Sequence, residues 1–473
     1  MERPNILFIN TDQQTWNVVS AYGNPHVRTP HIDRLHRNGT SFMRSYCADP
    51  VCSASRASWM TGRYTSENGV CFNVGLMHED VPDLGQILNR NGYDAVHCGK
   101  WHIRGRPMRD SFQNLYNGNR DIGAGGGEYY DRVSTHAVID FLDSRNSSKP
   151  FYLQIGLVNP HDICEYEHTH EFKTIPGPEA QGFSPDVLPP LPENFDYDER
   201  ETVVQQVFRR GKQPLHHHRI LNGIADWTDN QWRFLAWNHA RFTEMADHQI
   251  GLILNALDSS PFRDDTLIIF MADHGEANGQ HRTFQKFALY EESIRVPTII
   301  ATLGDHLDVG GNGRFDREHL VSGVDLFPTV LDYAAVEAPD DVQGRSLRPL
   351  LEGGASDWPD YAYVESNYWG RAIITARFKY VTEYRPKDPE DFIPPGPDPD
   401  ALGLEQLFDL DNDPWETKNI ASEPEFAGAV ASCRAKLLEH ESRLVRRPLR
   451  DGSPRDRLIE WGGPLRQRWA TSE

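Results

Sequence analysis

The stretch that decides the fold is Asn5-Ile6-Leu7-Phe8-Ile9-Asn10, which is followed directly by Thr11-Asp12-Gln13. Four consecutive apolar residues bounded by polar ones are typical of a short buried strand. The residues after the strand carry a carboxylate and an amide, which are groups that can bind a cation or a substrate. The stretch therefore predicts a buried strand that delivers chemically capable side chains at its carboxyl end.

The same pattern recurs three times along the chain. Apolar runs at 93–98, 151–158 and 266–272 end in polar residues, namely Lys100 and His102, His161, and Asp273 and His274. Helix-like periodicity lies between the runs, at 29–38, 83–91, 135–143 and 232–257. Alternating strands and helices favour an α/β fold, and ligands of open α/β sheets bind at the carboxyl ends of the strands. We predict a large, doubly wound, mainly parallel sheet with one functional edge.

The chain length and its later pattern indicate more than one domain. A chain of 473 residues exceeds one ordinary domain. Beyond about residue 360, short alternating segments such as Ala372–Thr375 and Lys379–Glu383 predict antiparallel strands. We expect a catalytic α/β domain over 1–355, and a smaller C-terminal α+β subdomain with an antiparallel sheet and a tail over 356–473. Residues 165–230, rich in Pro, Gly, His and charge, predict a long excursion over the site.

Composition narrows the partners and the compartment. The formal net charge of -21 argues against binding to nucleic acid or to an anionic membrane surface, so an anionic substrate needs a local cluster of Arg and Lys. Neither a secretory leader pattern nor a run of about 18 apolar residues is seen. The six cysteines show no C-x-x-C spacing, which favours a reducing compartment. We therefore expect a cytoplasmic protein that does not enter a membrane.

A second stretch, Cys52-Ser53-Ala54-Ser55-Arg56, continues to Thr61-Gly62-Arg63 and carries the chemistry. A spacing of four residues places the thiol and the guanidinium on one face of the first turn of a helix. Helix N-termini attract anions, so a nucleophile that meets a sulfate or phosphate ester would lie here. By itself, C-x-x-x-R is more often a buried cysteine before an ordinary helix, and the surrounding sequence has to decide.

That sequence resembles the signature of the type I sulfatases of the alkaline-phosphatase superfamily, which begins C-x-P/A-x-R and runs on to T-G-R. Ala54 stands where proline is commoner, a variation that the family's motif allows. The resemblance implies that a maturation enzyme oxidises Cys52 to formylglycine, whose hydrated aldehyde is the nucleophile. Glu405-Gln406-Leu407-Phe408-Asp409-Leu410 resembles the family's small C-terminal subdomain, so the likeness spans most of the chain.

A metal site is expected at the ends of the first and last of the four strands. Asp12, Gln13, Asp273 and His274 supply oxygen ligands that suit Ca²⁺ or Mg²⁺ and an imidazole that leaves Mn²⁺ or Zn²⁺ open. The resemblance implies that these positions hold one divalent metal ion, with Ca²⁺ favoured, which also contacts the residue formed from Cys52. Gln13 replaces the second aspartate of most members. The resulting set is more typical of the phosphonate monoester hydrolase and choline sulfatase branch, which leaves the metal and the substrate class open.

The resemblance also implies catalytic roles for five further residues. Lys100 and Arg56 hold the nucleophile and neutralise the sulfate, and His102 contacts the formylglycine diol. His161 resembles the family's sulfate-binding histidine, and Lys286 matches the lysine that precedes an R-V-P strand. The implied mechanism is attack of one diol hydroxyl on sulfur, followed by elimination. His161 or Lys286 protonates the leaving alcohol, and His102 takes the proton whose loss expels sulfate.

Three functions are compatible with these residues. The first is a sulfatase, a sulfuric ester hydrolase that acts on a sulfated sugar or another small sulfated alcohol. The second is a phosphonate monoester or phosphodiester hydrolase of the same superfamily. The third, a catalytically inactive binding protein, is disfavoured because a binding module has no use for a modifiable cysteine. A small anionic sulfate ester and a maturation enzyme are the expected partners, and the sequence leaves the alcohol and any oligomer open.

Overall fold

The computed structural model describes residues 3–73, 75–117, 126–164, 182, 184–201, 227–311, 313–354, 357–366, 370–384 and 402–450. Most of the expected excursion at 165–230, and the tail after residue 450, lie outside these residues. Within the described ranges, no helix is both long enough and apolar enough to cross a membrane.

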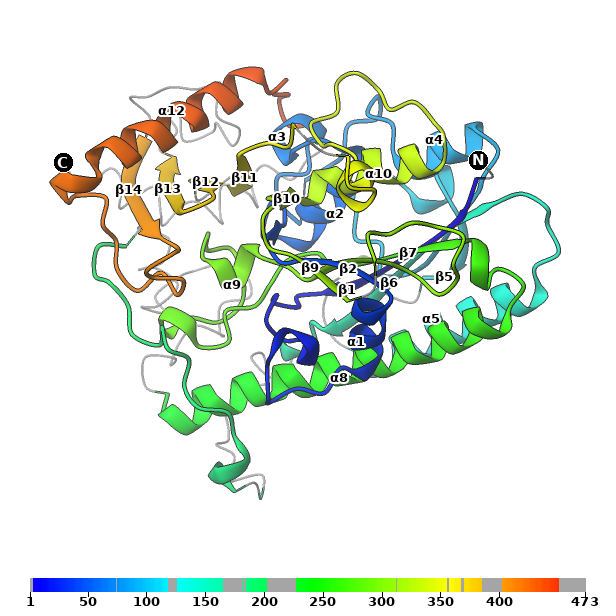
Figure 1. Cartoon of the computed structure of the whole chain (residues 1–473), viewed down its shortest axis with the longest axis horizontal. Coiled ribbons are helices and arrows are strands. Elements are labelled where there is room, and N and C mark those ends of the chain that lie inside the picture. The colour runs from blue at the N-terminus through cyan, green and yellow to red at the C-terminus, as the bar shows by residue number, and fades with distance from the viewer. Residues whose placement is uncertain are drawn as a thin grey trace.

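The main element is an eight-stranded sheet with the strand order β5-β4-β6-β1-β7-β8-β2-β9 (Figure 1). The five strands from β5 to β7 run parallel, β8 is antiparallel to both of its neighbours, and β9 is parallel to β2. The strands are β1 (Asn5–Asp12), β2 (Gly39–Phe42), β4 (Asp94–Gly99), β5 (Gln113–Tyr116), β6 (Phe151–Pro160), β7 (Thr266–Ala272), β8 (Thr298–Thr302) and β9 (Arg314–Asp316). The predicted mainly parallel sheet is confirmed.

Helices cover both faces of this sheet. On one face lie α1 (Pro30–Arg37), α5 (Gly127–Ser144) and α8 (Asp229–Ser259), and on the other α2 (Cys52–Thr61), α4 (Leu84–Arg90) and α10 (Leu326–Tyr333). A hydrophobic core lies on each face of the sheet. Alternate residues of β1 pack into one core or the other, because successive side chains of a strand point to opposite faces. Ile6 and Phe8 pack with the α2 side, whereas Leu7 and Ile9 pack with the α8 side. Burial on both faces explains why the strand sequence is continuously apolar.

The four strands predicted to carry function are neighbours at the centre of the sheet. β1 lies between β6 and β7, in parallel, with Ile6 opposite Tyr152 on one side and Leu267 on the other. β4 pairs with β6, also in parallel. All four carboxyl ends therefore meet at one edge, and the residues that follow them lie close together.

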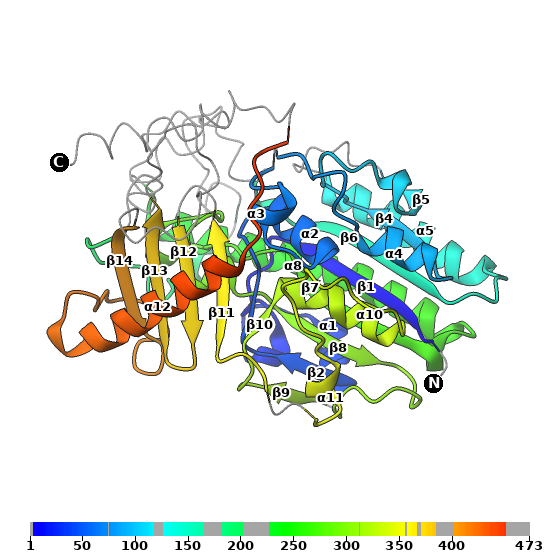
Figure 2. The same ribbon diagram turned by 90° about the horizontal axis from the view of Figure 1, so that it is seen from above.

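A separate four-stranded antiparallel sheet follows in the sequence, with the order β11-β12-β13-β14 (Figure 2). It is formed by β11 (Tyr361–Ser366), β12 (Gly370–Thr375), β13 (Phe378–Tyr384) and β14 (Leu402–Asp409). Helix α12 (Ala427–Arg443) packs along this sheet through residues such as Val430 and Leu437. The smaller antiparallel sheet is thus confirmed, while the domain limits of 1–355 and 356–473 stay predictions.

The remaining strands and α-helices among the described residues are short: β3 (Ser45–Tyr46), β10 (Val321–Ser322), α3 (Thr65–Asn68), α9 (Glu291–Ile294) and α11 (Arg348–Leu351). The largest difference from the expected helices is at α5, which begins eight residues before the predicted start, Thr135, at Gly127. Glycine is a poor helix former, so the helix propensity of Gly127 did not indicate that a helix begins there. Gly127 is suited to the position because a Cβ there would lie 2.8 Å from Asn159 and Asp162.

Candidate active site

Helix α2 begins at Cys52, as the signature predicted, and is buried along its whole length. The backbone N–H of Ser53 donates a hydrogen bond to Asn73 Oδ1 at 3.1 Å, which satisfies one of the free N–H groups at the helix N-terminus. The helix ends at Gly62, whose φ of 67° favours glycine. A Cβ at this position would also lie 2.9 Å from the ring of Phe327. The helix is therefore held at both ends, and its first residue faces the functional edge of the sheet.

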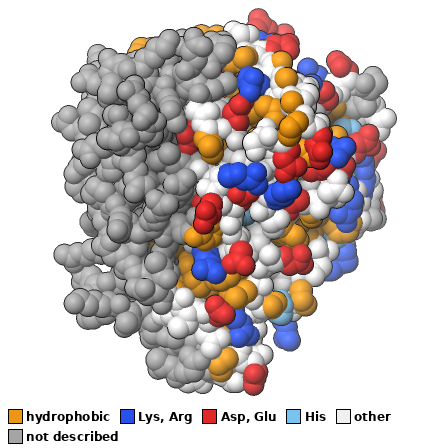
Figure 3. Space-filling model, turned by 90° about the vertical axis from the view of Figure 1, so that its left-hand side faces the viewer, with side chains coloured by type: hydrophobic (Ala, Val, Ile, Leu, Met, Phe, Trp, Pro, Cys, Tyr) orange, Lys and Arg blue, Asp and Glu red, His pale blue; other side chains and the backbone are white. Residues whose placement is uncertain are grey.

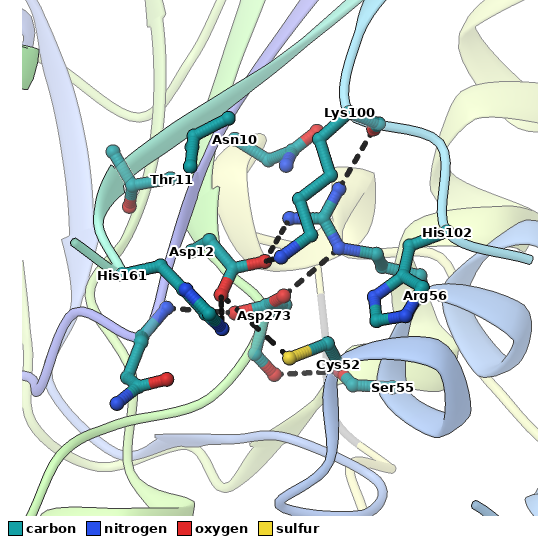
Figure 4. Close-up of polar contacts among 12 residues, drawn as sticks. Asn10, Thr11, Asp12, Cys52, Ser55, Arg56, Lys100, His102, His161 and Asp273 are labelled. Carbon is teal, nitrogen blue, oxygen red and sulfur yellow. Dashed lines mark hydrogen bonds and ion pairs between the residues drawn. The ribbon is translucent and has the colours of Figure 1, made fainter. Parts of the chain in front are cut away.

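Arg56 joins the ends of β1 and β7 (Figure 4). Its Nε donates to Asp273 Oδ2 at 2.9 Å, and its terminal nitrogens donate to Asp12 Oδ2 at 2.8 Å and to the Lys100 carbonyl at 2.9 Å. All three residues are buried. Because a guanidinium presents its donors in a fixed plane, these bonds fix the positions of both carboxylates.

Two more groups approach Asp12. Lys100 Nζ forms an ion pair with Asp12 Oδ2 at 2.7 Å, and His161 Nε2 lies 3.8 Å from Oδ1. Burial and the neighbouring Cys52 would raise the pKa of Asp12, but Lys100, His161 and Arg56 outweigh them and lower it. Asp12 is therefore ionised at neutral pH.

The sulfur of Cys52 lies at the centre of these groups. It is 3.1 Å from His274 Nε2, 3.1 Å from Lys286 Nζ and 3.7 Å from Asp12 Oδ1. Burial raises the pKa of the Cys52 thiol, but Lys286 and Lys100 outweigh burial and lower it. The cations that an anionic substrate requires in this acidic protein are thus gathered around one atom.

Gln13 has a more complex environment than the sequence predicted. Its φ of 68° is left-handed, and its N–H donates to Asp273 Oδ1 at 2.9 Å. Its side-chain oxygen accepts a hydrogen bond from Lys286 Nζ at 2.6 Å, and its amide nitrogen donates to Glu276 Oε2 at 2.5 Å. The side-chain oxygen is therefore one hydrogen bond away from the ammonium that contacts Cys52.

The segment from Lys100 to His102 turns sharply after β4. His102 has a left-handed φ of 56°, and its carbonyl accepts a hydrogen bond from Ser53 Oγ at 2.5 Å. This bond ties the segment to the first turn of α2. Burial lowers the pKa of His102, so its ring is neutral near pH 7.

The cluster has the ligands and the charge for a divalent metal ion. One ligand atom from each of Asp12, Cys52, Asp273 and His274 lies within 4.8 Å of the others, and all four side chains are buried. Burial and the charge of Asp12 raise the pKa of Asp273 to about 6, because two buried carboxylates repel each other. A bound cation would remove this repulsion, so these residues fit the ion that the family resemblance implies.

The structure brings together every residue that the sequence proposed for the site: Asp12, Gln13, Cys52, Arg56, Lys100, His102, His161, Asp273, His274 and Lys286. Two further residues, which were not predicted from the sequence, hold the others in place. Glu276 bonds Gln13, and Ser55 Oγ donates to the Asp273 carbonyl at 2.6 Å. Glu276 follows Asp273 by three residues at a strand end, and that position was the signal for it.

Three fixed cations, two carboxylates and a central thiol, at the carboxyl edge of an α/β sheet, define a class of protein. It is an ester hydrolase whose substrate carries a compact anionic group.

Comparisons with known proteins narrow this class. The sulfatase family model matches residues 4–336, and the model of the N-sulphoglucosamine sulphohydrolase C-terminal region matches residues 279–443. The Delta 4,5-hexuronate-2-O-sulfatase of Bacteroides thetaiotaomicron is 29% identical over 468 residues, which cover 93% of this chain and 89% of that protein. The chain belongs to the sulfatase family of the alkaline-phosphatase superfamily, and it is a sulfuric ester hydrolase.

Two solved structures are similar to this chain over most of its length. A 2-O GAG sulfatase has a TM-score of 0.76 and 27% identity, covering 93% of this chain and 92% of its own. The phosphonate monoester hydrolase of Agrobacterium radiobacter has a TM-score of 0.74 and 24% identity, covering 93% and 96%. The second likeness shows a shared fold.

Proposed function

We propose that this sulfatase hydrolyses the sulfate ester of a sulfated sugar, with formylglycine formed from Cys52 as the nucleophile. The observation that carries the proposal is the position of Cys52 Sγ, at the start of α2 and 3.1 Å from both Lys286 Nζ and His274 Nε2. The similarity of the chain to a hexuronate 2-O-sulfatase supports a sugar as the alcohol part of the substrate. A panel of sulfated monosaccharides and disaccharides, assayed for released sulfate, tests the proposal.

The metal ion, with Ca²⁺ favoured, would be held by Asp12, Gln13, Asp273, His274 and residue 52. When bound, it supplies positive charge that stabilises negative charge on the sulfate oxygens. Formylglycine, once formed and hydrated, supplies the attacking hydroxyl group. Arg56 and Lys100, both held against Asp12, place two further positive charges beside the sulfate.

Lys286 is the better candidate to protonate the leaving alcohol. Burial and the nearby Lys100 lower the pKa of His161 to about 3, so its ring is neutral at pH 7 and has little tendency to hold a second proton. Burial would also lower the pKa of Lys286, but Cys52, Cys164, Asp12 and Asp273 outweigh it and raise the pKa. The two carboxylates stay in place when Cys52 is converted to formylglycine, and they favour the charged form of Lys286. His161 then serves as a neutral hydrogen-bond partner for the sulfate. His102, also neutral, can accept the proton whose removal expels sulfate.

Cys52 should be at least partly converted to formylglycine when the protein is made in a host that has the maturation enzyme. The reason is the C-x-A-x-R motif, with Cys52 in the position that the family modifies. Trypsin releases the peptide of residues 45–56, and mass spectrometry should show loss of sulfur and gain of an aldehyde oxygen at residue 52. Active enzyme from its native host that carries only the unmodified thiol would contradict this prediction.

The second candidate is a phosphonate monoester or phosphodiester hydrolase. It is favoured by Gln13, which stands where most sulfatases have a second aspartate. A sulfate monoester carries one negative charge and a phosphate monoester nearly two, so the cations weigh differently on the two substrates. The charges of Arg56, Lys100, Lys286 and a divalent ion, offset by Asp12 and Asp273, can serve either ester. Membership of the sulfatase family decides for sulfate.

We therefore expect 4-nitrophenyl sulfate, or a sulfated sugar, to be turned over with a higher kcat/KM than the matching phosphate or phosphonate monoester. The comparison requires fully matured, metal-loaded protein. If the phosphonate or a phosphate diester is preferred by more than about tenfold, roughly 1.4 kcal/mol of transition-state stabilisation, the second candidate replaces the first.

The proposal includes the partners and the location of the protein. The modification requires a formylglycine-generating enzyme, and the substrate is a small anionic ester rather than nucleic acid. On the face drawn in Figure 3, basic side chains of the described residues lie among acidic ones. We also propose a cytoplasmic location. The six cysteines are buried and form no disulfide bond with one another, as is usual in a reducing compartment.

A further inference from the structure

We propose that Glu276 is a positioning residue that orients the Gln13 side chain and holds the segment carrying Lys286, and so sets the affinity of the site for its metal ion. The inference rests on the proposed function, in which Gln13 is a metal ligand. Glu276 is fully buried and lies three residues after Asp273.

The first step concerns the orientation of the Gln13 amide. An ionised carboxylate only accepts hydrogen bonds and an ammonium only donates them. Glu276 Oε2 lies 2.5 Å from the amide nitrogen of Gln13, and Lys286 Nζ lies 2.6 Å from the amide oxygen. Rotating the amide by half a turn would place its oxygen against the carboxylate and its N–H₂ against the ammonium. Glu276 and Lys286 together therefore fix which end of the Gln13 amide faces the site.

The second step concerns the strength of the Gln13 oxygen as a ligand. A hydrogen bond to a charged acceptor is stronger than a neutral one, and bonds in a chain polarise one another. The amide of Gln13 donates to a carboxylate, which shifts electron density toward its oxygen. An aspartate at position 13 would bring its own negative charge to the site. Here Glu276 supplies part of that charge indirectly, through its hydrogen bond with Gln13.

The third step concerns the segment around Lys286. Its two neighbours, Gln285 and Phe287, have left-handed φ angles of 65° and 84°, a conformation that residues other than glycine rarely adopt without supporting contacts. The backbone N–H of Gln285 donates to the second carboxylate oxygen of Glu276, and the Ala277 N–H donates to the Gln285 carbonyl at 2.8 Å. The Glu276 carboxylate thus anchors both the Gln13 amide and the segment that carries Lys286, and Lys286 Nζ donates to the Gln13 oxygen.

The backbone of Gln13 does not depend on Glu276. Its N–H donates to Asp273 Oδ1 at 2.9 Å, and its carbonyl accepts a hydrogen bond from His239 Nε2 at 2.8 Å. Loss of Glu276 should therefore remove one of the two groups that orient the Gln13 side chain, while the backbone of Gln13 keeps its place. The effect on metal binding should then pass through the Gln13 amide, which makes the proposal separable from a general loss of stability.

The experiment measures the binding of Ca²⁺ and of Mn²⁺, each titrated alone without substrate against a chelating dye. The proteins are the full-length chain, Glu276→Leu, the isosteric Glu276→Gln, Gln13→Ala and the two corresponding double variants. Carboxylates that orient metal ligands typically contribute 10- to 100-fold to affinity, so Glu276→Leu should weaken binding by about that factor and Glu276→Gln by less. In the Gln13→Ala background, either substitution at Glu276 should change the affinity by no more than about twofold.

Asp325 offers a matched control. Like Glu276 it is a buried carboxylate that accepts hydrogen bonds on both oxygens, here from the backbone N–H groups of Ser322 and Arg345 at 2.8 Å each. Asp325→Asn should lower the melting temperature while leaving metal affinity unchanged. If Glu276→Leu does not fold, Glu276→Gln carries the test.

Three results would overturn the inference alone, given a wild-type chain that binds metal and hydrolyses sulfate esters. The Glu276 variants bind metal as tightly as wild type, or they lose equal affinity with and without Gln13, or Gln13→Ala itself leaves affinity unchanged. A wild-type chain that neither binds these ions nor hydrolyses a sulfate ester would instead overturn the proposed function together with this inference.

Discussion

Replacing Cys52 by alanine should lower kcat for sulfate ester hydrolysis by at least about 10⁴-fold, because the variant has no side chain that can become the nucleophile. The fold should survive, since alanine is smaller than cysteine and is the best helix former, and residue 52 is the first residue of α2. Steady-state kinetics on the metal-loaded variant, with circular dichroism as the fold check, measures the effect.

The matched control for this variant is Cys71→Ala. Cys71 is also buried, but its sulfur donates only a weak hydrogen bond, to the Thr65 carbonyl at 3.6 Å. We expect its kcat to stay within about threefold of wild type, with a modest loss of stability. Activity of Cys52→Ala at the level of this control would show that the nucleophile is not residue 52.

Replacing Asp273 by alanine should abolish turnover, with a loss of at least about 10³-fold in kcat/KM, and should leave the protein unable to retain a divalent metal ion. Asp273 is one of two carboxylates in the candidate metal cluster, and it also accepts hydrogen bonds from Arg56 and from the Gln13 N–H. Its removal takes a negative charge from a site that must hold a strong cation. Elemental analysis after dialysis, together with steady-state kinetics, provides the measurement.

Asp273→Asn separates charge from shape in the same experiment. An asparagine oxygen can still accept the N–H bonds of Gln13 and His274, which Asp273 Oδ1 accepts at 2.9 Å each. We therefore expect the asparagine variant to lose metal and activity as the alanine variant does, while unfolding at a higher temperature. An active protein that carries no metal would exclude the proposed role of this cluster.

Sequence periodicity was sufficient to predict the sheet and its functional edge. The runs at 5–10, 93–98, 151–158 and 266–272 became β1, β4, β6 and β7, whose carboxyl ends meet. Burial on both faces imposes an uninterrupted apolar run, which can be read without knowing the strand's neighbours. The antiparallel position of β8 could not be read in this way, because strand direction depends on the connections and not on the residues of the strand.

The identities of the site residues were also present in the sequence. Cys52 and Arg56 share a helix face because of their spacing, and the cations were expected because a chain with a net charge of -21 needs a local positive pocket for an anion. The left-handed φ of His102 was missed, because it depends on a hydrogen bond from Ser53, a residue of another element.

The sequence by itself determined which strands are buried, where the nucleophile's helix begins, and which charged residues follow each strand, since all of these depend on local spacing and on alternation of polarity. Only the tertiary structure decided how the side chains pair. Gln13 and Glu276 are 263 positions apart, and Arg56 and Asp273 are 217 apart. The direction in which the Gln13 amide points is set by a carboxylate and an ammonium that the chain brings together only when it folds, and local sequence contains no record of those partners.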